Sequence, residues 1–396
     1  MNDGAMEGRH RGVHACFEEP GQGELAARVL AALRGAAELS SSDVRAARAA
    51  RDAHAWLLSF QRSSAFWRFA VSGAGAVLSV SGQTALRRSG TAAAAAGADE
   101  LLFFAASTAA RRVQTEWDAL AGDTQRDLVD APVALLGHAP ALQLGNSAAG
   151  AAPAPGHVAP GVRMLAVVCA NALVHAAASD SLEAVATAAV EGVLGVSITS
   201  GPGSNISNTN NGTDLGAAAP LQLLFLQVLC EEGESALARF GARGARLRAG
   251  RVTLLLARTV DPMLALCAAV LGAPRSPADP AVQHCLCACL DCLDAYAQMA
   301  LGPGLPAPAL ARVPVLPAIT ALLAESVAAP GLPAPAAALA VRCFVALRHA
   351  LCGPRQARVF RANPTALEQG FNALLSAWDR VWALFTCAQQ QQQVQQ

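Results

Sequence analysis

Residues 47–61 read Ala-Arg-Ala-Ala-Arg-Asp-Ala-His-Ala-Trp-Leu-Leu-Ser-Phe-Gln, and this stretch decides the fold class. Four of its apolar side chains recur at positions i, i+3, i+4 and i+7, so they share one face of a helix. They are Ala53, Trp56, Leu57 and Phe60. Residues 103–114 read Phe-Phe-Ala-Ala-Ser-Thr-Ala-Ala-Arg-Arg-Val-Gln and belong to a similar helix. Its shared face consists of Leu102, Ala106, Ala109 and Val113. Both stretches predict amphipathic helices.

Composition favours helix along the whole chain. The 396 residues are 53% hydrophobic but only 5% aromatic, so alanine and leucine supply most of the apolar surface. Alanine has the highest helix propensity of all residues. The formal net charge is zero, which argues against a protein that binds nucleic acid through its overall charge.

Helical segments, separated by Gly, Pro and Ser, follow one another from end to end. We predict about thirteen of them, two in each 40–55 residues or so, which is typical of HEAT repeats. The predicted segments are Glu24–Glu38, Ser42–Ser63, Ala65–Leu78, Asp99–Ala119, Thr124–Gly137, Val162–Ala178, Ser181–Gly195, Pro220–Ala238, Arg248–Leu271, Ala278–Met299, Pro308–Val327, Pro335–Leu351 and Thr365–Cys387. The expected fold is an all-α, HEAT/armadillo-like superhelical solenoid of about six helix pairs with one helix left over.

The predicted array covers residues 23–387, between a loose tail at 1–22 and a Gln-rich tail at 388–396. Low-complexity inserts, expected to be mostly disordered, are predicted near 82–97, 145–161, 197–216 and 302–308. The longest uncharged apolar runs, Met164–Ser179 and Leu221–Cys230, are shorter than the ~20 residues that span a bilayer. We therefore expect no membrane insertion.

Two clusters could carry chemistry. Cys285, Cys287, Cys289 and Cys292 have the look of a metal site, but one straight helix cannot direct four thiolates at one zinc ion. Core packing is the favoured interpretation, with Cys287 on a polar side beside Asp291 and Asp294. The second cluster could bind phosphate or an acidic cargo, or could cap helix carbonyls. It consists of Arg239, Arg243, Arg246, Arg248 and Arg251. No catalytic motif accompanies the histidines, so we expect neither enzymatic activity nor a cofactor.

The two opening helices carry a recognisable pattern. The first reads Trp56-Leu57-x-x-Phe60-Gln61-x-Ser63-x-x-x-Trp67, and the second reads Phe103-Phe104-Ala105-Ala106-x-Thr108. Together they resemble the first repeats of the importin-β (karyopherin-β) family of nuclear transport receptors, in the transportin-three and importin-thirteen branch. A looser likeness extends over about residues 24–386, with an importin N-terminal-like region over about 42–240. On this resemblance the chain would be the N-terminal part of a receptor.

The resemblance implies a receptor that moves between cytoplasm and nucleus. It implies binding to the GTP-bound GTPase Ran, to the Phe-Gly repeats of nucleoporins and to protein cargo, without nucleic acid. The family places the Ran surface on inner helices, here about Asp43–Ser63, Asp99–Asp118 and Val162–Ala178. The candidate Ran-binding residues are Arg51, Glu100, Arg111 and Asp118. That surface is usually acidic, so the arginines of the first helix depart from the family. The alternative is a helical-repeat scaffold that does not bind Ran.

Overall fold

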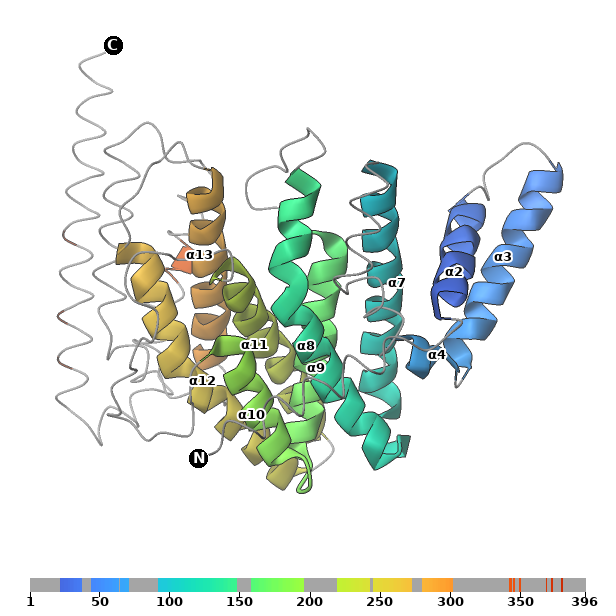
Figure 1. The fold of residues 1–396 in the computed structure, drawn as a ribbon. Coiled ribbons are helices and arrows are strands. Elements are labelled where there is room, and N and C mark those ends of the chain that lie inside the picture. Colours follow the sequence, from blue (N-terminus) through green and yellow to red (C-terminus); the bar gives the residue numbers. More distant parts are fainter. Residues whose placement is uncertain are drawn as a thin grey trace, which may run out of the picture. The chain divides into compact units, whose positions relative to one another are not determined.

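The computed structural model describes residues 22–37, 44–63, 65–70, 92–147, 158–195, 219–242, 245–272 and 280–301, with single residues between 342 and 379. Within these ranges the regular structure is helical and contains no strand, which confirms the all-α prediction there (Figure 1). The elements are α2 Gln22–Ala37, α3 Val44–Arg62, α4 Ala65–Arg68, α7 Ala92–Glu116, the 3-10 helix η3 Trp117–Ala119, α8 Gly122–Ser147, α9 Pro160–Ala178, α10 Glu183–Leu194, α11 Ala219–Ala242, α12 Arg246–Gly272 and α13 Pro280–Leu301.

Most predicted helices are observed within a few residues of their expected ends. The clearest differences are in α8 and α7. Helix α8 ends at Ser147, beyond the predicted Gly137 and inside the insert predicted near 145–161. Helix α7 begins at Ala92 and so takes in the end of the insert predicted near 82–97. The alanine run there is a strong helix former, and it lengthens the helix at its N-terminal end. Gly195 ends α10 as expected, in a left-handed conformation with φ 67°, and its N–H donates to the carbonyl of Glu191 at 2.8 Å.

Several predictions fall outside the described residues. They include the capping residues Ser42 and Asp43, the segment Pro308–Val327 and the inserts near 197–216 and 302–308. In the predicted helices Pro335–Leu351 and Thr365–Cys387, the few described residues are helical. The chain divides into two compact units, residues 1–153 with 158–176 and residues 154–157 with 177–396, which we call unit 1 and unit 2.

In unit 1, α2 packs against both α3 and α7. The stripe predicted on α7 is buried in full, with Leu102, Ala106, Ala109 and Val113 all at most 4% exposed. The stripe on α3 is buried only in part, because Leu57 and Phe60 are buried but Ala53 and Trp56 remain half-exposed. Trp56 therefore packs on Phe60 at the edge of the core and keeps part of its ring exposed.

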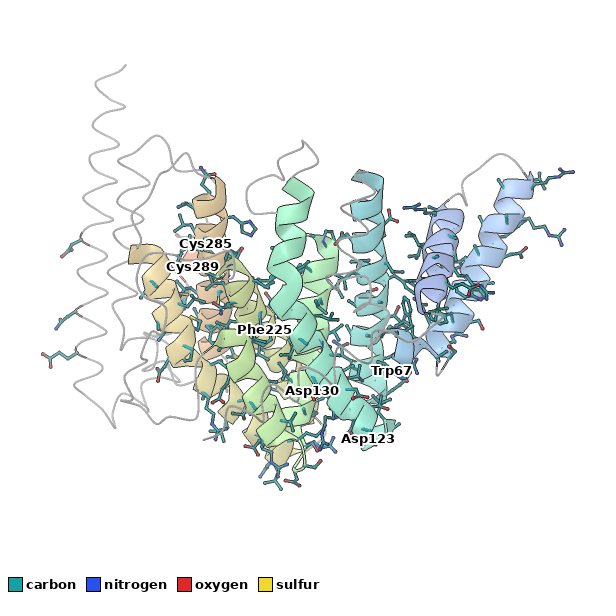
Figure 2. All side chains as sticks on the ribbon, viewed as in Figure 1. Trp67, Asp123, Asp130, Phe225, Cys285 and Cys289 are labelled. Carbon is teal, nitrogen blue, oxygen red and sulfur yellow. The ribbon has the colours of Figure 1, made fainter. Side chains whose placement is uncertain are left out.

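In unit 2, α11 packs against both α12 and α13, which also touch each other. The large apolar side chains of α11 are buried all around the helix, and Phe225, labelled in Figure 2, is one of them. Gly233 lets α12 approach closely, since a Cβ there would lie 2.6 Å from Cδ1 of Leu256. The α12 helix continues through Pro262.

Two described helices, Pro160–Ala178 and Arg246–Leu271, are long and apolar enough to cross a membrane, judged by length and composition alone. The first extends the uncharged run Met164–Ser179 towards its N-terminal end past Arg163, and the second lies outside both runs and includes charged residues such as Arg258 and Asp261. The apolar window is 78% buried in the first and 50% buried in the second. Core helices of soluble proteins have the same properties, so these helices are weak evidence for a membrane span.

Candidate functional site

The exposed side of α7 carries two of the four predicted site residues. Glu100 and Arg111 are exposed there, opposite the buried stripe, and Asp118 is exposed in η3, which follows directly. At 3.6 residues per turn these positions lie in one row along the helix. Phe103 lies in the same row and is 44% exposed. The fourth predicted residue, Arg51, is exposed on a different helix, α3.

The charged side chains in this row are exposed. Glu100 lies 3.9 Å from Nε of Arg34, and both side chains are more than half exposed, so the pair is weak.

The third helix of the expected surface, α9, exposes few side chains. Apart from Pro160 and Arg163, its side chains are buried or half-buried, which leaves little of Val162–Ala178 for a partner. The contribution of this helix to a Ran surface stays a prediction, and only its exposed end, Pro160 and Arg163, offers fully exposed side chains.

The two sequence motifs meet at Arg112, which the sequence analysis did not single out. Its Nη1 donates to the carbonyls of Gln61 (3.2 Å) and Ser63 (3.1 Å) at the end of α3. Its Nε and Nη2 donate to Oε2 of Glu116, at 3.0 and 2.7 Å. The guanidinium lies 4.5 Å from the ring centre of Trp67, which is labelled in Figure 2. Arg112 thus satisfies carbonyls that the end of α3 leaves open and ties α3 and α4 to α7.

An aromatic cluster surrounds this junction. Phe66 makes edge-on contacts with Phe60, Trp67 and Phe104, at centroid distances of 5.8 to 6.5 Å. The Trp56 ring stacks on the Phe60 ring at a centroid distance of 5.4 Å. The guanidinium carbon of Arg28, an exposed residue, lies 4.7 Å from the centre of the Trp56 ring. Most motif residues therefore pack in the core of unit 1, whereas Phe103 is exposed and Trp56 is half-exposed.

Polar side chains of α7 fix its neighbours in unit 1. Thr108 Oγ1 accepts from Gln61 Nε2 at 2.8 Å, which adds a second link to α3. The buried Asn171 accepts from Gln114 Nε2 at 3.1 Å and donates to the carbonyl of Val167 at 3.0 Å. These bonds satisfy an amide inside the apolar helix α9, where an unpaired polar group would be costly.

Asp99 caps α9 from the neighbouring helix. Its Oδ1 accepts a hydrogen bond from the N–H of Gly161 at 3.0 Å, so it satisfies one open donor at the start of α9. Burial raises the pKa of the Asp99 carboxyl, the Gly161 bond lowers it, and the nearby charge of Glu100 raises it. Gly161 has no room for a side chain, because a Cβ would lie 2.6 Å from Asp99 Oδ1 and 2.9 Å from the Asp99 carbonyl oxygen.

The cysteines of α13 lie in and at the edge of the core of unit 2. Cys289 and Cys292 are fully buried, while Cys285 is half-buried. Cys285 lies one turn before Cys289, and Figure 2 labels both residues. Burial raises the pKa of Cys285 to about 11, and burial with the charge of Asp291 raises the pKa of Cys287. Within the described ranges, no group of three or more His, Cys, Asp or Glu side chains is placed to hold a metal ion.

Asp294, which we expected on a polar side of α13, is buried. Asp294 is 7% exposed, and its Oδ2 accepts from Nε of Arg342 at 2.8 Å. A residue far along the chain therefore covers this carboxylate. Nearby, Tyr296 and Thr259 are both fully buried, and their hydroxyl oxygens are 2.7 Å apart across α12 and α13. Neither long-range pair had a signal in the sequence pattern.

The arginines of the cluster at residues 239–251 have different surroundings in the structure. Arg251 donates to the carbonyl of Ala178 at 3.2 Å, pairs with Asp180 and lies 3.8 Å from Glu183. For Arg251 the capping interpretation is confirmed. Arg246 and Arg248 are exposed, and Arg243 lies outside the described residues.

The described histidines include His54, His175 and His284, which lie on three different helices. His54 is exposed on α3, and His175 of α9 lies beside Trp117 at 5.6 Å. Burial lowers the pKa of His284, on the first turns of α13. Comparison with protein-family models finds no match for this chain, and comparison with curated proteins finds none either.

Proposed function

We propose that this chain is a protein-binding receptor of the importin-β type, built as a HEAT/armadillo-like solenoid, which binds GTP-bound Ran. The observation that carries the proposal is the row along α7 and η3 formed by Glu100, Phe103, Arg111 and Asp118. An exposed aromatic residue between charged ones is the usual make-up of a protein interface. The row sits on a helix whose opposite face is fully buried, so its side chains are held on a rigid support.

The sequence motifs support the same proposal. They form the junction of α3, α4 and α7, which sets the orientation of the exposed row. Nucleoporin Phe-Gly repeats and protein cargo would bind elsewhere on the array, and the receptor would move between cytoplasm and nucleus. The chain would have no chemistry of its own, since GTP is hydrolysed on Ran.

The test is a binding measurement with the full chain and Ran locked in its GTP or GDP form. We expect binding that requires GTP and that the double variant Glu100→Arg, Asp118→Arg weakens about tenfold, mainly through slower association. The matched control, Glu24→Arg with Asp261→Arg, makes the same change in charge at exposed positions elsewhere and should bind normally. Equal binding of both nucleotide forms, or no binding, would contradict the proposal.

A second candidate is a helical scaffold that binds proteins without Ran. The exposed side of α3 favours it, because Arg48, Arg51 and Arg62 give that side a positive charge where a Ran surface would be acidic. Binding of protein partners that does not depend on the nucleotide state of Ran would support this candidate.

A further inference from the structure

Helix α3 has two sides of opposite character. Ala50, Leu57 and Phe60 are buried on one side, where α2 packs. The other side is exposed and carries Arg48, Arg51 and Arg62. At 100° per residue, these three arginines fall within about 60° of arc and extend over roughly 20 Å of helix. We call this surface the α3 cationic face.

The arginines of this face differ from others in unit 1. Arg28 lies on the ring of Trp56, and Arg112 holds the end of α3. Those two arginines fasten helices to one another. By contrast, Arg48, Arg51 and Arg62 make no ion pair or hydrogen bond with any side chain in the part of the chain that the structure describes.

Among the described residues, the α3 cationic face therefore forms no hydrogen bond or ion pair that would hold helices together. Arg48 and Arg51 are three residues apart, a spacing at which like charges on a helix repel. The one acidic residue of α3, Asp52, is exposed and forms no ion pair within the described ranges. Three unpaired guanidinium groups in one row are a surface whose charge is complementary to a row of carboxylates.

We propose that the α3 cationic face is a docking surface for an acidic protein segment. Guanidinium groups bind carboxylates through two parallel hydrogen bonds, which suits Asp and Glu side chains. Val44, 78% exposed, and Leu58, 41% exposed, lie on the same side and offer apolar contact to a polypeptide. This inference does not depend on Ran binding, which we assign to the row on α7.

A protein partner fits this face better than a nucleic acid. Of the aromatic residues of α3, Phe60 is buried, and the Trp56 ring stacks on Phe60 and lies against the guanidinium of Arg28, so neither offers a free ring on which a base could stack. Three cations on one helix, in a chain whose net charge is zero, are also few for binding along a phosphate backbone.

The experiment measures binding of a fluorescent peptide of ten glutamates to the full chain by polarisation at low salt. The test variant is Arg48→Glu, Arg51→Glu, Arg62→Glu. Its matched control is Arg126→Glu, Arg163→Glu, Arg246→Glu, which makes the same change in net charge at exposed positions on other helices. A neutral variant with glutamine at positions 48, 51 and 62 covers the case in which the reversed charges disturb folding, and melting curves check all three.

We expect at least a tenfold loss of affinity in the test variant, a smaller loss in the glutamine variant and little change in the control. Asp52→Asn should increase the affinity, and added salt should weaken binding in every variant that still binds. Equal losses in test and control variants would overturn the proposal, as would no binding by the unaltered chain. Tighter binding of a single-stranded RNA of similar length through the same arginines would overturn the assignment to a protein partner.

Discussion

Replacing Arg112 with alanine should loosen the N-terminal helices of unit 1. The change removes hydrogen bonds to the carbonyls of Gln61 and Ser63, the ion pair with Glu116 and the contact with the Trp67 ring. A hydrogen bond to a charged group contributes roughly 1.5–3 kcal/mol, and a cation–π contact about 0.5–2 kcal/mol. These contributions overlap, and the Glu116 side chain is 43% exposed, so we expect a loss of about 2–4 kcal/mol in total.

Hydrogen exchange resolved along the chain is the suitable measurement, because two compact units need not unfold together. A loss of that size makes amide hydrogen exchange through local opening about 30- to 1000-fold faster. The effect should be confined to amides of α3, α4 and α7. Arg112→Lys keeps the charge but cannot donate to two carbonyls and the carboxylate in the same way, so it should give a smaller loss.

The neighbouring residue provides the control. Arg111 is exposed on the same helix, and Arg111→Ala should change stability by less than about 0.5 kcal/mol. If Arg112→Ala and Arg111→Ala had the same exchange pattern, the junction assigned to Arg112 would not be a source of stability, and the explanation of how the two motifs cooperate would fail.

Three further predictions concern other parts of the chain. Trp56→Ala should lower the free energy of unfolding by about 1–3 kcal/mol, less than the loss of a fully buried ring would. Hydrogen exchange should become faster in α2 and α3 while α11–α13 stay protected, and an equal loss of protection in all these helices would contradict the separation into units. Gly161→Ala should lower the melting temperature, at a cost of about 1–3 kcal/mol, because the new methyl group meets the Asp99 backbone, whereas Gly192→Ala, in open space, should raise it slightly. Alkylation of Cys285, followed by peptide mass spectrometry, should be slow at pH 8 and rise about tenfold per pH unit towards its pKa of about 11; a plateau near pH 9 would refute the burial argument.

Sequence reasoning worked best where the signal is local. Helix periodicity predicted the part of α7 from Asp99 onwards, and the stripe that starts at Leu102 is buried as expected, whereas the alanine run before it was assigned to an insert. The same reasoning gave a candidate row of charges, since the residues opposite a buried stripe must be exposed. Glu100, Arg111 and Asp118 are exposed for that reason.

Long-range contacts could not be predicted in this way. Arg112 looked like one more surface arginine, although Glu116 four residues later was a signal of an ordered side chain. Asp294 is buried because Arg342, from a distant part of the chain, covers it. Trp56 has the spacing of a core residue, but it lies at the rim of the contact with α2, where Arg28 covers one face of its ring.

The pair of hydroxyl groups between α12 and α13 has a spectroscopic consequence. Tyr296 is the one tyrosine of the chain, so any tyrosinate absorbance in the ultraviolet has a single source. Burial raises the pKa of its phenol well above the ordinary value, and the hydroxyl is engaged with Thr259. In an alkaline titration the phenol can ionise at its ordinary pH only after water has entered between α12 and α13. Unit 2 therefore carries an intrinsic optical reporter of its own opening, and no label has to be attached to follow it.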